Sequence, residues 1–254
     1  MRNGNDARYP LTKTTAQTGL NRKTPSMICG SASLLNQCGD CSDCACQLTT
    51  CDENHAPNLP IIYSLELTPA CNNRCPGCGN VFSHTPNLSL SRDRWQAVLD
   101  MIAPYARKLK ITGGEPTLHT EFSKIITAIA DLDLPFTLFT NGRWQKPREL
   151  LSFLQQVPQC TGLLISLHGP DAQSHEAFTG VHGSFEETVE NIRRATDLGL
   201  MVATSTVITR YNVTRVEEMT DFALSIGAGQ AVFNRYLGSP LPKIEPTPNE
   251  LRSA

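Results

Sequence analysis

The amino-acid sequence predicts an α/β fold in which parallel strands are joined by helices. From residue 60 onward, short apolar runs of strand length alternate with longer segments whose apolar residues recur at helical spacing. Glycines and polar residues follow the apolar runs, where the strands would end. Such alternation is typical of parallel strands connected by right-handed helical crossovers.

Six apolar runs have the length expected of buried strands. The first precedes a loop rich in cysteine, and the second precedes a Gly-Gly-Glu-Pro sequence. The predicted strands cover residues 61–67, 109–112, 136–140, 163–167, 202–208 and 230–234.

Cap residues and apolar stripes predict the helices between these strands. Ser91 is expected to cap the first helix, and Pro104 is expected to bend or end it. Capping boxes are expected at residues 184–187 and 214–217. The buried stripes are expected to hold Trp95, Val98, Leu99 and Ile102; Phe122, Ile125, Ile126 and Ile129; Leu150, Leu151 and Leu154; Phe185, Val189 and Ile192; and Val216, Met219, Phe222 and Ile226.

Composition and charge exclude several classes of protein. The 254 residues carry a net charge of −2, so nucleic acid is not expected as a partner. No apolar run reaches membrane-spanning length, and the polar residues 1–28 do not form a secretory signal. Ten cysteines without such a signal indicate a reducing compartment and metal ligation. We therefore expect a cytoplasmic protein without a membrane partner.

The chain divides into three predicted parts. Residues 1–28 are expected to be a flexible tail, 29–59 a cysteine-rich extension and 60–254 the catalytic core. The extension holds six of the cysteines, and four of them are spaced closely enough to bind zinc or an iron–sulfur cluster. An alternative is a set of accessible reduced thiols. The four candidate ligands of this second metal are Cys38, Cys41, Cys44 and Cys46.

The end of the chain carries a strong helix start. Residues 247–250 place Thr at the N-cap, Pro at the first helical position and Glu at the third. Only four residues follow, so we expect a fragment that lacks its last helix and any C-terminal domain. A frayed tail is the alternative.

Three cysteines follow the first predicted strand with C-x3-C-x2-C spacing: Cys71, Cys75 and Cys78. Three thiols in one loop can bind a four-iron cluster and leave its fourth iron open to a small ligand. The alternatives are a zinc loop completed by a distant ligand, or reduced core thiols. Further candidates follow other strands and are expected at the same rim, where active sites of parallel barrels lie. They are Gly113, Gly114, Glu115, Asn141, Ser166 and Arg235.

The cysteine triplet followed by Gly-Gly-Glu-Pro resembles the radical S-adenosylmethionine (radical SAM) superfamily. Over residues 60–240, the resemblance implies a partial (β/α)6 TIM-like barrel that binds a [4Fe-4S] cluster and S-adenosylmethionine. It also implies reductive cleavage of S-adenosylmethionine to a 5′-deoxyadenosyl radical, with flavodoxin or ferredoxin as a possible class of electron donor. The protein would supply placement and exclusion of competing reactions.

The resemblance implies roles for individual residues around S-adenosylmethionine. Gly113 and Gly114 would allow close backbone approach, and Glu115 would accept hydrogen bonds from the ammonium group. The remaining cofactor-binding candidates are Asn141 at the rim, Ser166 and Ser205 near the ribose or nucleoside, Arg235 at a carboxylate and Tyr236 against the adenine. The superfamily often has an aromatic residue before the third cysteine, where this chain has Gly77.

The ends of the third, fourth and sixth strands resemble the branch that contains molybdenum-cofactor enzyme A and the SPASM-domain maturases. Ala203 occupies the position of a basic residue that would hold GTP, so a GTP substrate is disfavoured. A maturase acting on a peptide or a cofactor precursor is the favoured interpretation. The alternative is a non-catalytic metal-binding interaction protein with a degenerate or truncated barrel.

Overall fold

The computed structural model describes residues 61–80, 88–237, 241 and 243–253. These residues belong to one compact unit, Ala56–Ala254. The predicted tail and the cysteine-rich extension, with Cys38, Cys41, Cys44 and Cys46, lie outside the described residues.

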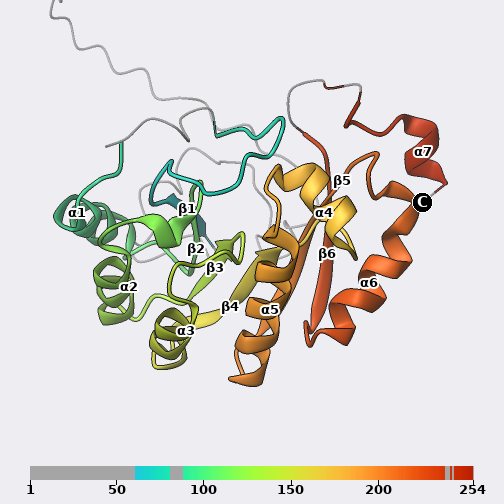
Figure 1. Cartoon of the computed structure of the whole chain (residues 1–254). Coiled ribbons are helices and arrows are strands. Elements are labelled where there is room, and N and C mark those ends of the chain that lie inside the picture. The colour runs from blue at the N-terminus through green and yellow to red at the C-terminus, as the bar shows by residue number, and fades with distance from the viewer. Residues whose placement is uncertain (1–60, 81–87, 238–240, 242, 254) are drawn as a thin grey trace, which may run out of the picture. The chain divides into compact units, whose positions relative to one another are not determined.

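Six parallel strands form one sheet in which every strand pairs with its neighbour in sequence order (Figure 1). This arrangement confirms the α/β fold and the partial (β/α)6 TIM-like barrel. The third and fifth strands have the predicted bounds, whereas the fourth begins earlier because it continues through Thr161 and Gly162, outside the apolar run. The strands are β1 (Ile62–Glu66), β2 (Lys108–Thr112), β3 (Phe136–Thr140), β4 (Cys160–Ser166), β5 (Val202–Ile208) and β6 (Gln230–Arg235).

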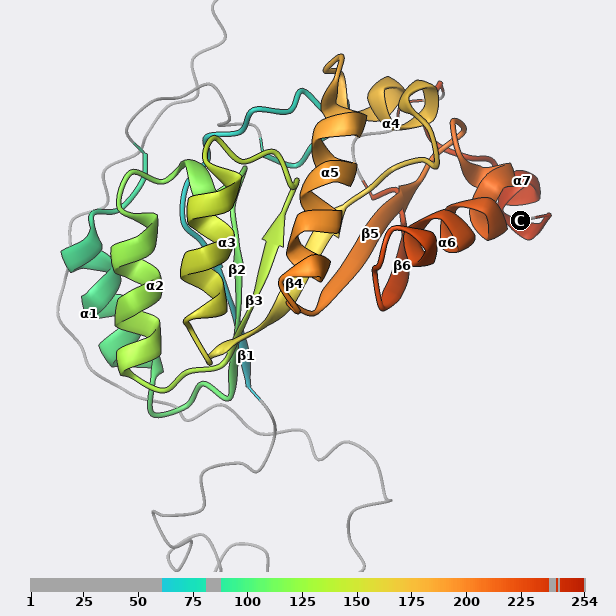
Figure 2. The same cartoon turned by 60° about the horizontal axis from the view of Figure 1, so that its bottom comes forward.

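Helices follow the strands and cover the outer face of the sheet (Figure 2). One of them, α4, was not predicted, because the residues it buries include Ser174, His175 and Thr179 and give no apolar stripe. None of the helices in the described part of the chain is both long and apolar enough to cross a membrane. The helices are α1 (Arg92–Ile102), α2 (Phe122–Asp131), α3 (Pro147–Gln155), α4 (Ala172–Thr179), α5 (Ser184–Asp197), α6 (Val216–Ser225) and α7 (Pro248–Arg252), with the 3-10 turns η2 (Pro116–Leu118) and η3 (Val213–Arg215).

The hydrophobic core lies between the sheet and the helices. Alternate residues of each strand point into it, as period-two side-chain geometry requires. The predicted stripes are buried at Trp95, Leu99, Phe122, Ile125, Ile126, Ile129, Leu151, Leu154, Val189, Ile192, Met219 and Ile226, and the other predicted stripe residues are partly buried. On the opposite face of the sheet, Phe139, Leu164, Ser205 and Val207 are only partly buried, and that face is open toward the site.

All four predicted caps can be compared with the structure. Ser91 caps α1 as predicted, because its hydroxyl accepts the Arg94 N–H at 3.5 Å. The Thr247 box is present: its hydroxyl accepts the Glu250 N–H at 3.2 Å, and the Glu250 carboxylate accepts the Thr247 N–H at 2.6 Å. The box at 184–187 was wrong, because Gly183 is the N-cap and Glu176 of α4 accepts its N–H at 2.7 Å. The box at 214–217 was also wrong, because η3 precedes α6, and the N-cap residue of α6, Arg215, makes no side-chain cap hydrogen bond.

Candidate functional site

A cavity of about 540 Å³ opens at the carboxyl ends of the strands. This is the edge of a parallel barrel at which ligands bind. Apart from Glu115, every site residue predicted in the core lines the cavity: Cys71, Cys75, Cys78, Gly113, Gly114, Asn141, Ser166, Ser205 and Arg235. Residues from all six strand ends or the loops behind them therefore meet at one place.

The three cysteines of the loop after β1 are free thiols, of which Cys71 and Cys75 are half-buried and Cys78 is exposed. The Cys78 N–H donates to the Cys75 carbonyl at 3.3 Å, which closes a tight turn. The Cys71 sulfur accepts the Asn73 N–H at 3.4 Å. Hydrogen bonds from backbone N–H groups within the loop thus help to position the cysteine side chains.

Burial disfavours ionisation of two of the thiols. The pKa of Cys75 is raised to about 12, mainly by burial and also by the charges of Cys71 and Cys78. Burial is also the main cause that raises the pKa of the Cys71 thiol. Cys71 and Cys75 therefore favour the thiolate form only beside a bound cationic centre that balances their charge.

The donor set fits an iron–sulfur cluster. Cys71, Cys75 and Cys78 all line the cavity, and cysteine thiolates are the ligands that hold such clusters.

The glycine loop after β2 packs directly on the segment that precedes Cys71. The Gly114 N–H donates to the Thr68 carbonyl at 2.7 Å. A Cβ at Gly113, whose φ is +151°, would lie 2.5 Å from the Thr68 carbonyl oxygen, and one at Gly114 would lie 2.4 Å from that of Ala70. Glycine is therefore required here by the contact between the two loops, in addition to the ligand approach expected from the sequence.

Glu115 lies behind the cavity rather than in its wall. Its carboxylate is fully buried and accepts hydrogen bonds from the Thr140 hydroxyl at 2.9 Å and the Asn141 N–H at 2.7 Å. Thr117 donates through its hydroxyl at 2.7 Å and its N–H at 3.2 Å. Burial raises the pKa of this carboxyl. These donors contact both carboxylate oxygens, and the expected contact with the cofactor ammonium stays a prediction.

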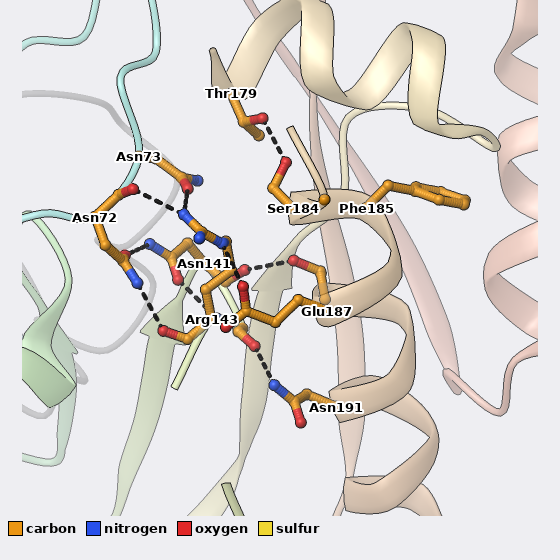
Figure 3. A network of polar contacts seen from close by, with 12 residues as sticks. Asn72, Asn73, Asn141, Arg143, Thr179, Ser184, Phe185, Glu187 and Asn191 are labelled. Carbon is orange, nitrogen blue, oxygen red and sulfur yellow. Dashed lines mark hydrogen bonds and ion pairs between the residues drawn. The ribbon is translucent and has the colours of Figure 1, made fainter. Parts of the chain in front are cut away.

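A polar network joins the cysteine loop to the end of β3 and to α5 (Figure 3). Arg143 donates to the Asn72 carbonyl at 2.7 Å, to Asn73 Oδ1 at 2.9 Å and to Glu187 Oε2 at 2.8 Å. Sequence reasoning missed Arg143. Its only signal is a basic residue directly after the Thr-Asn-Gly strand ending, and its contacts are about 70 residues away in the chain.

Two serines and an arginine complete the wall formed by β4, β5 and β6. Ser166 and Ser205 are register partners on neighbouring strands. The Asn234 amide donates to the Ser205 hydroxyl at 3.1 Å, and Arg235 is exposed at the end of β6. Hydroxyls and a guanidinium thus face the cavity that the thiols share.

Tyr236 is buried and lies against the cysteine loop. A Cβ at Gly77, whose φ is +68°, would lie 1.7 Å from the Tyr236 hydroxyl oxygen. The chain therefore has glycine before the third cysteine because the tyrosine ring occupies the adjacent space. Both residues line the cavity.

His168 is a neutral side chain in the cavity wall. Its Nδ1 accepts the Val207 N–H at 3.3 Å, so the ring proton is on Nε2. Its pKa is lowered to about 3, mainly by burial and also by the neighbouring His175. The ring packs against Phe178 with 4.5 Å between centroids. Such a group can donate a hydrogen bond but does not act as a base near neutral pH.

Comparison with known proteins identifies the family of the chain. The family model described as "Radical SAM superfamily" matches residues 65–223, more than half of the chain. The AdoMet-dependent heme synthase of Nitratidesulfovibrio vulgaris is 29% identical over 179 residues, which cover 69% of this chain and 48% of that protein. The sporulation killing factor maturation protein SkfB of Bacillus subtilis is 28% identical, with coverage of 67% and 41%. The chain thus spans less than half the length of these curated relatives.

Solved structures show the same fold. Streptococcus suis SuiB bound to its precursor peptide SuiA has a TM-score of 0.63 and 17% identity, over 70% of this chain and 39% of that one. The family match covers β2 to β5, the cysteine loop and the glycine loop, which supply most of the cavity wall, whereas β6 lies beyond it. The chain belongs to the radical SAM superfamily.

Proposed function

We propose that this chain is the core of a radical SAM maturase whose cluster is held by Cys71, Cys75 and Cys78. The observation that carries the proposal is that three free thiols share one cavity with groups from the ends of the other strands. When bound, the [4Fe-4S] cluster and S-adenosylmethionine supply a 5′-deoxyadenosyl radical. The protein residues bind, orient and enclose these groups.

The cavity wall offers a matching group for each part of S-adenosylmethionine. Ser166 and Ser205 present neighbouring hydroxyls that suit the ribose diol, and Arg235 suits a carboxylate through its paired donors. Tyr236 gives the wall an aromatic surface for the adenine. Glu115 acts from behind, because its bonds to Thr140 and Asn141 fix the strand end on which the cavity depends.

We further propose a peptide or cofactor precursor as the substrate. The relatives include a killing factor maturation protein and a heme synthase, and one similar structure holds a precursor peptide. Ala203 supports this choice over a nucleoside triphosphate, because alanine and its neighbours in register, Leu164 and Gln230, are uncharged. A flavodoxin or ferredoxin would serve as electron donor.

Cluster ligation is tested on the full chain after anaerobic reconstitution with iron and sulfide. The barrel cluster should be lost when Cys71, Cys75 and Cys78 are replaced by Ala. Iron, sulfide and the reduced-cluster electron paramagnetic resonance (EPR) spectrum are measured, with the spectrum followed as S-adenosylmethionine is added. Cys160→Ala is the matched control, because this half-buried free thiol begins β4 and does not line the cavity.

The expected result is loss of the S-adenosylmethionine-dependent spectrum in the triple variant and its retention in Cys160→Ala. An unchanged spectrum in the triple variant contradicts the ligand assignment. A wild-type cluster that ignores S-adenosylmethionine favours a metal-binding interaction protein instead.

A further inference from the structure

The side-chain amide of Asn141 faces a candidate cluster ligand. Its Nδ2 lies 3.9 Å from the Cys71 sulfur and 2.6 Å from Asn72 Oδ1, while its Oδ1 accepts the Arg143 N–H at 2.8 Å. The reversed amide would place oxygen against Asn72 Oδ1 and an NH2 group against the Arg143 N–H. The hydrogen-bond network therefore assigns the donor end to the sulfur.

The backbone of Asn141 is held on both sides. Its N–H donates to Glu115 Oε2 at 2.7 Å, and its carbonyl accepts the Thr188 hydroxyl at 3.1 Å. The residue is 8% exposed, and Glu115 itself is fully buried. The amide thus has little freedom to turn away from Cys71.

Arg143 holds the cysteine loop in place beside the contact between Asn141 and Cys71 (Figure 3). Its guanidinium binds the Asn72 carbonyl and Asn73 Oδ1, and Asn72 Nδ2 returns a bond to the Arg143 carbonyl at 2.8 Å. Glu187 of α5 fixes the guanidinium at 2.8 Å. The Asn141 amide and the cysteine loop are therefore held by the same set of contacts, which keeps the amide N–H next to the Cys71 sulfur.

We propose that Asn141 donates a hydrogen bond to the Cys71 thiolate and thereby raises the reduction potential of the bound cluster. The inference rests on the proposed ligation by Cys71. A donor to a ligating sulfur withdraws negative charge, which stabilises the reduced cluster more than the oxidised one. Asn141 thus makes the cluster easier to reduce, and Arg143 is a positioning residue for that bond.

The test is a potentiometric titration of the reconstituted full chain, followed by EPR and normalised to cluster content. Asn141→Leu keeps a similar shape and removes the donor, so the midpoint potential should move to more negative values. Asn141→Asp keeps the oxygen that accepts the Arg143 N–H but replaces the NH2 donor with a second carboxylate oxygen. Because this adds negative charge beside the sulfur, the midpoint potential should fall further. Asn191→Ser is the control, because its amide donates to the Gly142 carbonyl at 2.8 Å and does not touch Cys71.

Equal potentials for wild type and Asn141→Leu overturn the inference, as does a rise in either Asn141 variant. If only Asn141→Leu loses its cluster, Asn141→Asp decides the matter. If both variants stay folded without a cluster, Asn141 is a requirement for binding and the tuning role is wrong. An S-adenosylmethionine-dependent EPR signal that survives replacement of Cys71, Cys75 and Cys78 contradicts the proposed ligation instead, so the two failures are distinguishable.

Discussion

At the scale of single residues, the site joins the thiols of one short loop to side chains that lie far apart in the chain. The spacing of Cys71, Cys75 and Cys78 is visible in eight residues, so their shared cavity could be expected. The position of Glu115 could not, because its main partners, Thr140 and Asn141, lie 25 and 26 residues further along. The same applies to Arg143.

The buried histidine pair gives a prediction on stability. Burial lowers the pKa of His168 to about 3 and that of His175 to about 4. Both folded values lie below the unfolded value near 6.5, so the unfolded chain takes up protons first as the pH falls. Stability is therefore full above pH 6.5 and decreases below it, by roughly 2 kcal/mol for each histidine between pH 7 and pH 5.

Urea unfolding of the metal-free chain at pH 7 and pH 5 measures this loss. His175→Gln should remove about half of the histidine-dependent difference. His182→Gln is the control, because its hydrogen bond to Glu176 raises the pKa of this fully exposed histidine and acts in the opposite direction, so the variant should not reduce the difference. A difference unaffected by His175→Gln would show that the ring is not neutral in the folded state.

At the scale of elements, the apolar pattern predicts where the strands lie, whereas tertiary contacts determine where the helices begin. β3 and β5 have their predicted bounds because their apolar runs end at turn residues. Ser184 has the sequence of a cap, yet its hydroxyl pairs with Thr179 at 2.7 Å while Glu176 serves the helix start. No local sequence pattern predicts that Glu176 replaces Ser184 at the helix start, because this requires α4 to lie against α5.

The contact between the glycine loop and the cysteine loop yields a second prediction. Gly113→Ala places a Cβ 2.5 Å from the Thr68 carbonyl oxygen at a φ of +151°, so it should lower the free energy of unfolding by roughly 2–4 kcal/mol. Iron retained after reconstitution should fall as well, because the displaced segment leads into Cys71. Chemical denaturation and iron analysis provide the measurements.

Gly229→Ala is the matched control for that substitution. Its Cβ would meet nothing closer than the Val202 carbonyl oxygen at 3.8 Å, so the change should cost less than about 1 kcal/mol. If the two variants lose a comparable free energy of unfolding, the contact between the glycine loop and the cysteine loop does not contribute to stability as proposed.

At the scale of the whole molecule, the core and the cysteine-rich extension are expected to bind metal independently. Deleting residues 1–56 should lower the total metal content and leave the barrel cluster and its response to S-adenosylmethionine intact, because Cys71, Cys75, Cys78 and the other described lining residues are retained. Metal analysis of the two chains checks this. Equal metal content would contradict a second centre at Cys38, Cys41, Cys44 and Cys46.

The cysteine loop is supported from two sides that are far apart in the chain. Gly114 binds it from β2, and on the other side the Arg74 N–H donates to the Thr179 carbonyl at the end of α4, at 2.8 Å. The loop therefore cannot acquire its final shape until the chain has closed contacts across more than a hundred residues. During synthesis, we expect cluster insertion to wait until β4 and α4 have been translated and folded.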